Sequence, residues 1–517
     1  MRRFRRLFLA AWLATAVGLL ATACGSGKSD PYAGLPEPSF GVTVPKKRPA
    51  YEPKFTKQSR CPVRGADDKR ITVRIECGEL TVPENRDKPQ ERLVTLQVAI
   101  LHSVSPTPKP DPVVYLEGGP GGSALASLES WVIPPSPLLA ERDVIIMDQR
   151  GTGYSNPRFT CGFEYNRASR TDQEIDALTK CFERYSGGQY DLDHYGTADA
   201  AADVADLRRA LGLDQINLFG VSYGTRLALQ VMAEFPEGIR SAVLDSNFPG
   251  GIRYFEEQPA NAYRSFKAVF DACAADPSCN ARYPNLEQTL AEVINSLDAN
   301  PVTLKRRKFN NVTEDYQFKG TDFVKYLFRA MYDTGMVSAL PKALTLSKRN
   351  PLVGLDYLFS QASITLDIND DVKRRPTFGD GLFYLIVCSE EGSNVTKEQL
   401  AARSAEIPEP ARSALTKNTE EILDVCARWT PLPPEQVTQA TIDIPALVLA
   451  GTMDPITPPV WSQIANSRLT KGSYVEVYGA GHGVFWSGDC AANLVTAFIN
   501  DPAAGGGAGC PPVLNWQ

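Results

Sequence analysis

The sequence predicts an α/β protein built on a mostly parallel, doubly wound sheet that is interrupted by one large, mainly helical insertion. Up to about residue 250, short apolar runs alternate with amphipathic helical patterns, as in strand–helix–strand units. From there to about residue 435 the pattern is mostly helical, and strand patterns then resume. We therefore expect a leader at residues 1–23, a tether at 24–65, core segments at 66–250 and 436–517, and a helical cap at 251–435.

The leader has the features of an export signal. A basic start, MRRFRR, precedes an apolar stretch over residues 7–23. Small residues stand directly before Cys24, as in the cleavage site of bacterial lipoprotein precursors, although Ala21 holds the place where leucine is usual. The sequence predicts that Cys24 becomes a lipidated N-terminus on the outer face of the cytoplasmic membrane, from which the protein could be released. A plain secretory signal or an uncleaved anchor helix is the alternative.

Residues 24–65 have the composition of a flexible tether. They contain six prolines between residues 31 and 53 and many polar side chains. Loss of the leader removes four arginines and no acid, so the formal net charge changes from −6 to −10. This charge argues against nucleic acid or an anionic membrane surface as the main partner. No later stretch of the sequence is long and apolar enough to span a bilayer.

The cysteines predict disulfide bonds. There are eleven, so ten remain when Cys24 carries a lipid. An even number of cysteines in an exported protein is typical of disulfides. We expect neighbours along the chain to pair, although the sequence leaves the connectivity open: Cys61–Cys77, Cys161–Cys181, Cys273–Cys279, Cys388–Cys426 and Cys490–Cys510. Only three histidines and no close CxxC pair are present, which disfavours a metal site.

The predicted elements follow one another in a clear order. Residues 71–83 and 92–103 have the pattern of two antiparallel strands. Short apolar runs predict buried parallel strands at 112–118, 142–148, 216–220, 239–245, 443–451 and 473–479. Helical patterns are clearest at 198–213, 225–235, 261–276, 286–299 and 491–499. The insertion thus follows the sixth predicted strand.

The segment GVSYG, residues 220–224, is the only G-x-S-x-G pattern of the chain. It follows a predicted strand and precedes a predicted helix, which is the setting of a nucleophile elbow. There the chain turns so sharply that a side chain two residues to either side of the serine would clash. An ordinary Gly/Ser turn is the alternative. We predict that Ser222 is a catalytic nucleophile.

A serine nucleophile needs a histidine base. His482 lies in GAGHG, just after the last predicted strand, where a short glycine-rich loop can bring an imidazole over the elbow. His102 ends an early strand and His194 precedes a helix, both far from the sheet edge where the elbow opens. We therefore predict His482 as the base rather than as a structural histidine.

The acid that orients the base is expected after the preceding strand. LAGTMDPITP places Asp454 there, and the order Ser222, Asp454, His482 is the order of elbow-type hydrolases. Asp245 and Asp148 are the rival acids, because each also follows a predicted strand. The tight turn that ends its strand favours Asp454.

An oxyanion hole is the remaining part of such a site. The glycine-rich segment YLEGGPGGS follows a buried strand, and glycines let backbone N–H groups approach a substrate closely. We predict the amides of Gly119 and Tyr223 as the donors. A phosphate-binding loop is disfavoured, because the segment lacks the Lys-Ser/Thr of a P-loop and fails the G-x-G-x-x-G pattern.

Five segments together resemble the proline iminopeptidase and tripeptidyl aminopeptidase family of α/β hydrolases: EGGPGG, DQRGTGYSNP, ALGLDQINLFGVSYGT, LAGTMDPITP and GAGHG. The similarity runs from about residue 70 to 510 and is closest to secreted actinobacterial lipoprotein peptidases. It implies an α/β-hydrolase fold and a serine exopeptidase. We expect a monomer that needs no cofactor. Such an enzyme hydrolyses N-terminal residues or short peptides from polypeptides, and the cap limits access to chain ends. One departure weakens strict proline specificity: Glu117 stands where iminopeptidases carry histidine.

The resemblance also implies where a substrate's ammonium group is held. Related peptidases carry a cysteine followed two residues later by an acid, which corresponds to Cys388 and Glu390 in YLIVCSEEGS. A carboxylate binds an ammonium group through a charge-assisted hydrogen bond. We therefore expect Glu390, or else Glu391, to bind the amine. Two solvated surface acids are the plain alternative.

Two other functions share this scaffold. A carboxylesterase or lipase would use the same triad, because the fold does not fix the substrate. A binding lipoprotein without catalysis is disfavoured by the complete set of Ser222, Asp454, His482 and the glycine-rich loop.

Overall fold

The computed structural model describes residues 50–516, apart from residues 64, 163–171, 308–312, 362–377, 393–394, 430–439 and 508. The predicted leader, Cys24 and most of the predicted tether lie outside the described residues. Within the described part of the chain, none of the helices combines the length and the apolar character needed to cross a membrane.

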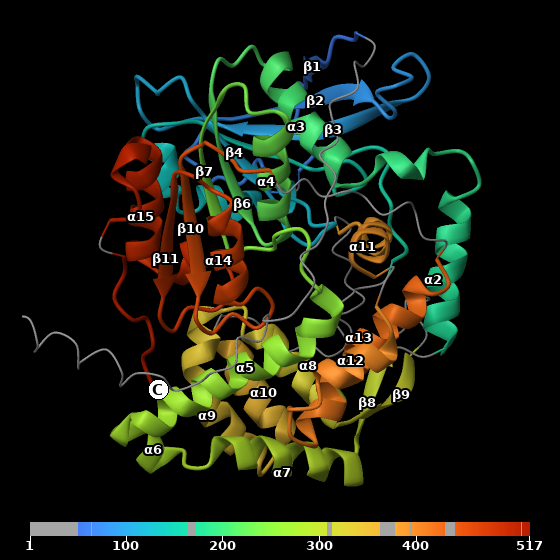
Figure 1. Ribbon diagram of the computed structural model, residues 1–517, viewed down its shortest axis with the longest axis vertical. Coiled ribbons are helices and arrows are strands. Elements are labelled where there is room, and N and C mark those ends of the chain that lie inside the picture. The colour runs from blue at the N-terminus through green and yellow to red at the C-terminus, as the bar shows by residue number, and fades with distance from the viewer. Residues whose placement is uncertain are drawn as a thin grey trace, which may run out of the picture. The chain divides into compact units, whose positions relative to one another are not determined.

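A nine-stranded sheet forms the centre of the molecule, in the order β1-β2-β3-β5-β4-β6-β7-β10-β11 (Figure 1). The strands β5-β4-β6-β7-β10-β11 pair in parallel, whereas β1, β2 and β3 join them as an antiparallel edge. Their bounds are β1 Lys54–Lys57, β2 Ile75–Pro83, β3 Leu93–Leu101, β4 Val113–Leu116, β5 Val144–Met147, β6 Ile216–Val221, β7 Ile239–Asp245, β10 Ala446–Gly451 and β11 Gly472–Val477. The predicted, mostly parallel sheet is confirmed.

Strand β1 lies inside the segment 24–65 that the sequence assigned to a tether, so residues 54–57 belong to the sheet. It pairs with β2 as an exposed edge strand of sequence KFTK. Its lysines suit a solvent-facing edge. Because the strand is polar like the residues around it, the sequence analysis did not recognise it. Because β1 precedes the strands that were predicted, the insertion follows β7, the seventh strand of the structure.

Both faces of the parallel sheet are buried, which explains the continuous apolar runs. Along β4, Val114 and Leu116 join one core cluster, while Val113 and Tyr115 join the cluster on the other face. The helices and single turns outside the insertion are α1 Leu128–Val132, η1 Leu125–Ser127, η2 Pro137–Ala140, α2 Asp172–Tyr185, η3 Leu192–His194, α3 Thr197–Ala210, α4 Tyr223–Glu234, α14 Pro459–Ser467, η6 Val484–Ser487, α15 Asp489–Asn500 and η7 Pro502–Ala504.

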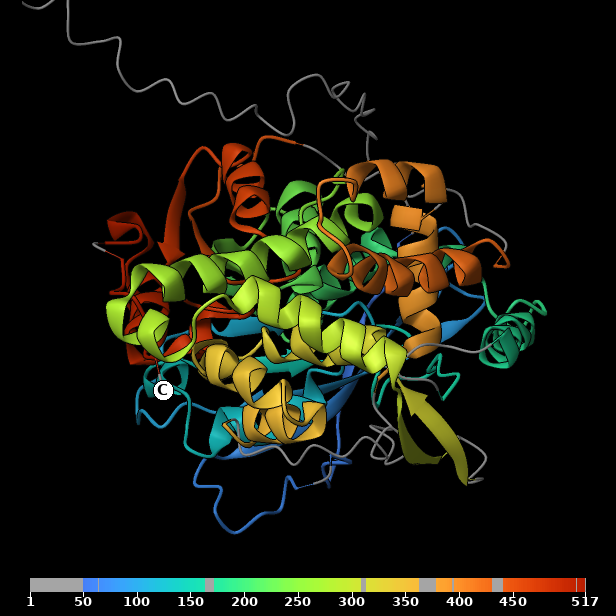
Figure 2. The ribbon, with the colours of Figure 1, turned by 90° about the horizontal axis from the view of Figure 1, so that it is seen from below.

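The insertion is helical as predicted, with one hairpin that the sequence analysis missed (Figures 1 and 2). Its elements are α5 Tyr254–Ala275, α6 Pro277–Arg282, α7 Leu286–Ala299, β8 Val302–Arg307, β9 Thr313–Phe318, α8 Gly320–Ala330, α9 Thr334–Ser347, α10 Pro351–Ser360, α11 Asp380–Ile386, the π-helix η5 Val387–Gly392, α12 Lys397–Arg403 and α13 Ala411–Cys426. Helices α5 to α10 share a core of their own, whereas α11 and η5 pack into a core cluster of the sheet. The insertion is therefore joined to this cluster by its last third and by the start of α5, where Tyr254 and Phe255 belong to the same cluster.

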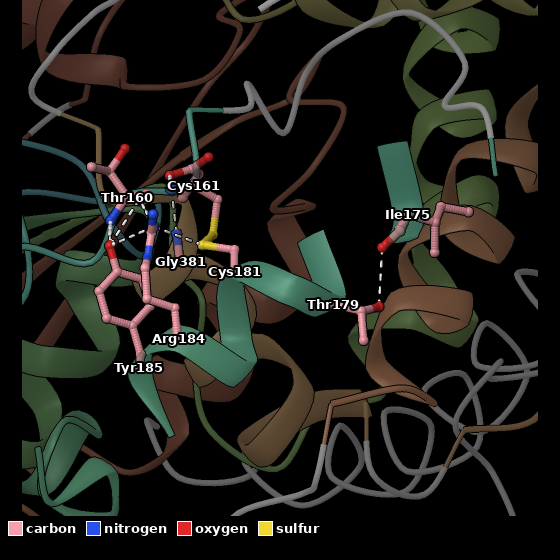
Figure 3. Close-up of a disulfide and its surroundings, with 9 residues drawn as sticks. Thr160, Cys161, Ile175, Thr179, Cys181, Arg184, Tyr185 and Gly381 are labelled. Carbon is pink, nitrogen blue, oxygen red and sulfur yellow. Dashed lines mark hydrogen bonds between the residues drawn. A yellow bond between two sulfur atoms is a disulfide. The ribbon is translucent and has the colours of Figure 1, made fainter. Parts of the chain in front are cut away.

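All five predicted disulfides are formed in the structure. Figure 3 shows Cys161–Cys181, which ties the chain after β5 to helix α2. Beside it, the hydroxyl of Tyr185 donates to the carbonyl of Thr160 at 2.8 Å. The bond Cys388–Cys426 joins η5 to the end of α13, so a disulfide fixes the segment that carries Glu390.

Candidate active site

Ser222 lies at the sharp turn between β6 and α4. Its backbone has φ 59° and ψ −127°, a conformation that non-glycine residues rarely adopt. A Cβ on Gly220 would come within 2.3 Å of the carbonyl oxygen of Gly224, and a Cβ on Gly224 within 2.0 Å of that of Leu116. Both glycines of GVSYG are thus required by close backbone contacts, which is the geometry expected of an elbow.

His482 and Asp454 form a short hydrogen-bonded pair at the ends of β11 and β10. The Nδ1 atom of His482 lies 2.7 Å from Oδ2 of Asp454, and the Asp454 side chain is fully buried. Burial alone would raise the pKa of this carboxyl, but His482 and the neighbouring donors hold it below its usual value. Burial disfavours the imidazolium, yet Asp454, Asp245 and Glu117 outweigh it and raise the pKa of His482. The structure thus brings the predicted base and the predicted acid together.

Thr457 is a contact that the sequence analysis missed. Its hydroxyl donates to Oδ2 of Asp454 at 2.6 Å and lies 3.1 Å from Nδ1 of His482. The amides of Ile456 and Thr457 donate to the other carboxylate oxygen, both at 2.9 Å. A hydroxyl residue three positions after an acid is the local signal that could have indicated this contact.

The rival acid Asp245 is buried beside the histidine loop but binds its backbone instead of the imidazole. Its two oxygens accept the amides of Val484 and Phe485, each at 2.8 Å, and burial raises its pKa to about 6. The next residue, Ser246, accepts the amide of Gly483 through its hydroxyl at 2.8 Å. Asp245 therefore anchors the loop that follows His482, while Asp454 contacts the ring.

The other rival acid, Asp148, is also committed elsewhere. It accepts the hydroxyl of Ser123 and the amides of Leu125 and Tyr154. The other two histidines have carboxylate partners of their own. Nδ1 of His102 lies 3.0 Å from Oδ2 of Asp143, and Nδ1 of His194 lies 3.0 Å from Oδ2 of Asp199. Among the described residues no cluster of side chains is suited to hold a metal ion.

The glycine-rich loop packs directly on the nucleophile. A Cβ on Gly118 would lie 2.9 Å from the Cβ of Ser222. Gly119 is exposed and has φ 121°, which a glycine adopts freely. Its N–H donates to no other group in the described structure, and Tyr223 is the first residue of α4, so its N–H lies at a helix N-terminus. The predicted donors Gly119 and Tyr223 therefore flank Ser222.

Helix α5 of the insertion binds the acid loop. The guanidinium of Arg264 donates to the carbonyls of Thr452, at 2.9 Å, and Asp454. The hydroxyl of Ser265 donates to the carbonyl of Met453 at 2.6 Å. Three successive carbonyls, ending at the catalytic acid candidate, are thus held by the cap.

The corner between α8 and α9 binds the histidine loop. The amide of His482 donates to the carbonyl of Tyr332, and the amide of Gly481 donates to the hydroxyl of Thr334, both at 3.1 Å. The Tyr332 ring meets the imidazole edge to face, with ring centroids 4.8 Å apart. Gly379, before α11, donates to the carbonyl of Gly121 at 2.8 Å. Segments of the cap therefore contact the acid, base and glycine-rich loops.

Glu390 and Glu391 lie beside the nucleophile helix but are closed off from solvent. Their side chains are 0% and 3% exposed, and both pair with Arg226, four residues after Ser222. Glu390 also accepts the hydroxyl of Thr197 at 2.8 Å. Burial raises the pKa of Glu391 to about 7, although Arg226 opposes this. An ammonium group would have to displace Arg226 or Thr197 to reach these carboxylates. This geometry counts against direct binding of an amine by Glu390 or Glu391. The amine-binding role of these two residues stays a prediction.

Comparisons with known proteins agree with this geometry. A family model described as the alpha/beta hydrolase fold matches residues 111–353, and one described as TAP-like protein matches residues 413–509. Serine protease Hip1 of Mycobacterium tuberculosis is 26% identical over 458 residues, which cover 82% of this chain and 84% of that protein.

Two further relatives match shorter parts. Tripeptidyl aminopeptidase of Streptomyces coelicolor is 32% identical over 199 residues, covering 35% of this chain and 36% of that protein. Proline iminopeptidase of Heyndrickxia coagulans is 27% identical over 150 residues, covering 29% of this chain and 40% of that protein. The chain has the α/β-hydrolase fold and is a serine hydrolase.

Proposed function

We propose that the protein is an exported serine exopeptidase that hydrolyses N-terminal residues or short peptides from polypeptides. The observation that carries this proposal is the constellation around Ser222. A strained serine between two obligatory glycines lies against a glycine-rich loop. A histidine whose Nδ1 is held 2.7 Å from a buried aspartate follows β11.

The chemistry follows from these positions. Nδ1 of His482 is committed to Asp454, so Nε2 takes the proton of the Ser222 hydroxyl as its oxygen attacks the substrate carbonyl. The amides of Gly119 and Tyr223 stabilise the negative charge on the carbonyl oxygen. The imidazolium then gives its proton to the leaving amine, and the acyl group stays on Ser222. Water, deprotonated by His482, releases the acid and restores the hydroxyl.

The cap supports action at chain ends. Its segments contact all three loops around the nucleophile, through Arg264, Tyr332, Thr334 and Gly379. We infer that a cap held this way limits access for the middle of a folded polypeptide. Relatives named tripeptidyl aminopeptidase and proline iminopeptidase act at N-termini, as their names state.

Export and lipid anchoring through Cys24 are part of the proposal. The basic, apolar and small-residue pattern of the leader supports them. A Cys24→Ser variant should leave the mature protein outside the membrane fraction, because its anchor is lost. Unchanged fractionation with membranes would contradict the lipid assignment.

The exopeptidase proposal is tested with one peptide amide prepared with a free and with an acetylated N-terminus, beside a short-chain ester. The free peptide should be the best substrate by kcat/KM. A Ser222→Ala variant should lose all three activities by at least about 10³-fold while keeping its circular dichroism spectrum, since removal of the nucleophile disables the triad. Preference for the blocked peptide or the ester in the unmodified enzyme would favour a carboxylesterase or lipase instead.

Arg264 should contribute to turnover although it belongs to the cap. In Arg264→Ala the carbonyls of the acid loop lose their donor, and a shift of the Asp454–His482 pair by a fraction of an ångström is costly. We expect kcat to fall about 10- to 100-fold with little change in KM, on ester and peptide alike.

The matched control is Arg253→Ala at the start of the same helix, since Arg253 pairs with Glu256. It should retain full kcat. An equal loss in both variants would indicate damage to the cap as a whole and would contradict a specific role for Arg264.

A further inference from the structure

Glu117 is a carboxylate at the wall of the nucleophile site. It follows β4 and opens the glycine-rich loop, and its neighbour Gly118 packs on Ser222. The loop folds back over it, because a Cβ on Gly122 would lie 2.8 Å from its Cγ. Glu117 is partly exposed. Together with Asp454 and Asp245, it opposes the effect of burial on the pKa of His482.

The hydrogen bonds of Glu117 leave it incompletely satisfied. One oxygen accepts the amide of Gly118 at 2.9 Å, and the other accepts the hydroxyl of Tyr115 at 3.2 Å. A carboxylate offers about four lone-pair positions, so acceptor capacity remains on both oxygens. Within the part of the chain that the structure describes, no lysine or arginine forms an ion pair with it. Burial raises the pKa of this carboxyl, although the amide of Gly118 and the hydroxyl of Tyr115 oppose the rise. A cation bound to the carboxylate would therefore stabilise its charged form.

The other acids near the elbow differ in this respect. Asp454 is committed to His482, and Asp245 is fully buried and accepts two backbone amides and the hydroxyl of Ser246. Glu390 and Glu391 are buried against Arg226. Among these five acids, Glu117 alone combines exposure with the lack of a cationic partner.

We propose that Glu117 binds the N-terminal ammonium group of the substrate, beside the oxyanion hole. This inference rests on the proposed exopeptidase function and assigns the amine site to a residue other than Glu390. An ammonium group would supply the missing cation through charge-assisted hydrogen bonds. Because Gly118 packs on Ser222, the bound amine belongs to a residue close to the attacked carbonyl. The favoured substrates are thus peptides from which short N-terminal units are released.

The first test measures the ratio of kcat/KM for the free and the acetylated form of one peptide. Glu117→Gln keeps the shape of the side chain and one oxygen that can accept from Gly118. Its NH2 group replaces the oxygen that faces the Tyr115 hydroxyl, which can turn to accept from it, and the charge is removed. The ratio should fall about 10- to 100-fold, because this factor corresponds to the free energy of a hydrogen bond to a charged group. Glu390→Gln is the control. This variant can lower kcat/KM for both peptides, but the ratio of the two values should remain near that of the unmodified enzyme.

The second test uses a probe without a peptide bond. n-Butylammonium should inhibit ester hydrolysis competitively in the unmodified enzyme, and its inhibition constant should rise at least about 10-fold in Glu117→Gln. An unchanged ratio and inhibition constant in Glu117→Gln would overturn the inference. An equal loss of kcat/KM for both peptides in Glu117→Gln would also overturn it, because Glu117 would then only stabilise the loop. A fall of the ratio in Glu390→Gln, with no fall in Glu117→Gln, would overturn it as well.

Failure of the proposed function has a different outcome. It would appear in the unmodified enzyme, as a preference for the acetylated peptide over the free one.

Discussion

The hydrogen bond between His482 and Asp454 is the interaction on which the rest of the site depends. It joins the ends of two neighbouring parallel strands, β11 and β10, at 2.7 Å. Asp454 is buried completely, so its charge is tolerable only because His482, Thr457 and backbone amides surround it. In turn the carboxylate fixes Nδ1 of the imidazole, which leaves Nε2 for Ser222. The sheet order brings the strand of Ser222 and the strands of this pair to the same edge.

The cap is part of this arrangement rather than a cover placed over it. Arg264 holds the acid loop, the α8–α9 corner holds the histidine loop, and Gly379 contacts the glycine-rich loop. A fourth link is the buried pairing of Glu390 and Glu391 with Arg226, which joins the π-helix to the helix that begins after Ser222. These contacts come from segments more than 100 residues apart in the chain. The insertion therefore holds the loops that carry the candidate acid and base and the glycine-rich loop.

The sequence predicted the features that are encoded locally. Buried strands appear as short apolar runs, the elbow as glycines two residues from a serine, and the triad as the order of Ser222, Asp454 and His482. Contacts between segments that are distant in the chain leave no such local pattern in the sequence. Arg264 and Tyr332 look like ordinary helix residues, and the polar strand β1 resembles its proline-rich surroundings. The burial of Glu390 was hidden for the same reason, because its partner Arg226 lies 164 residues away.

The pH dependence of kcat/KM for a small ester without ionisable groups tests the central claim most directly. His482 must be neutral to accept the proton of Ser222. Burial lowers the pKa of His482, but Asp454 and the other acids raise it above the ordinary value, so the imidazolium persists to higher pH. As the pH falls, activity should be lost with a midpoint above about 6.5, the usual pKa of histidine. A midpoint at or below that value would contradict the pairing of His482 with Asp454 as the interaction that governs the site.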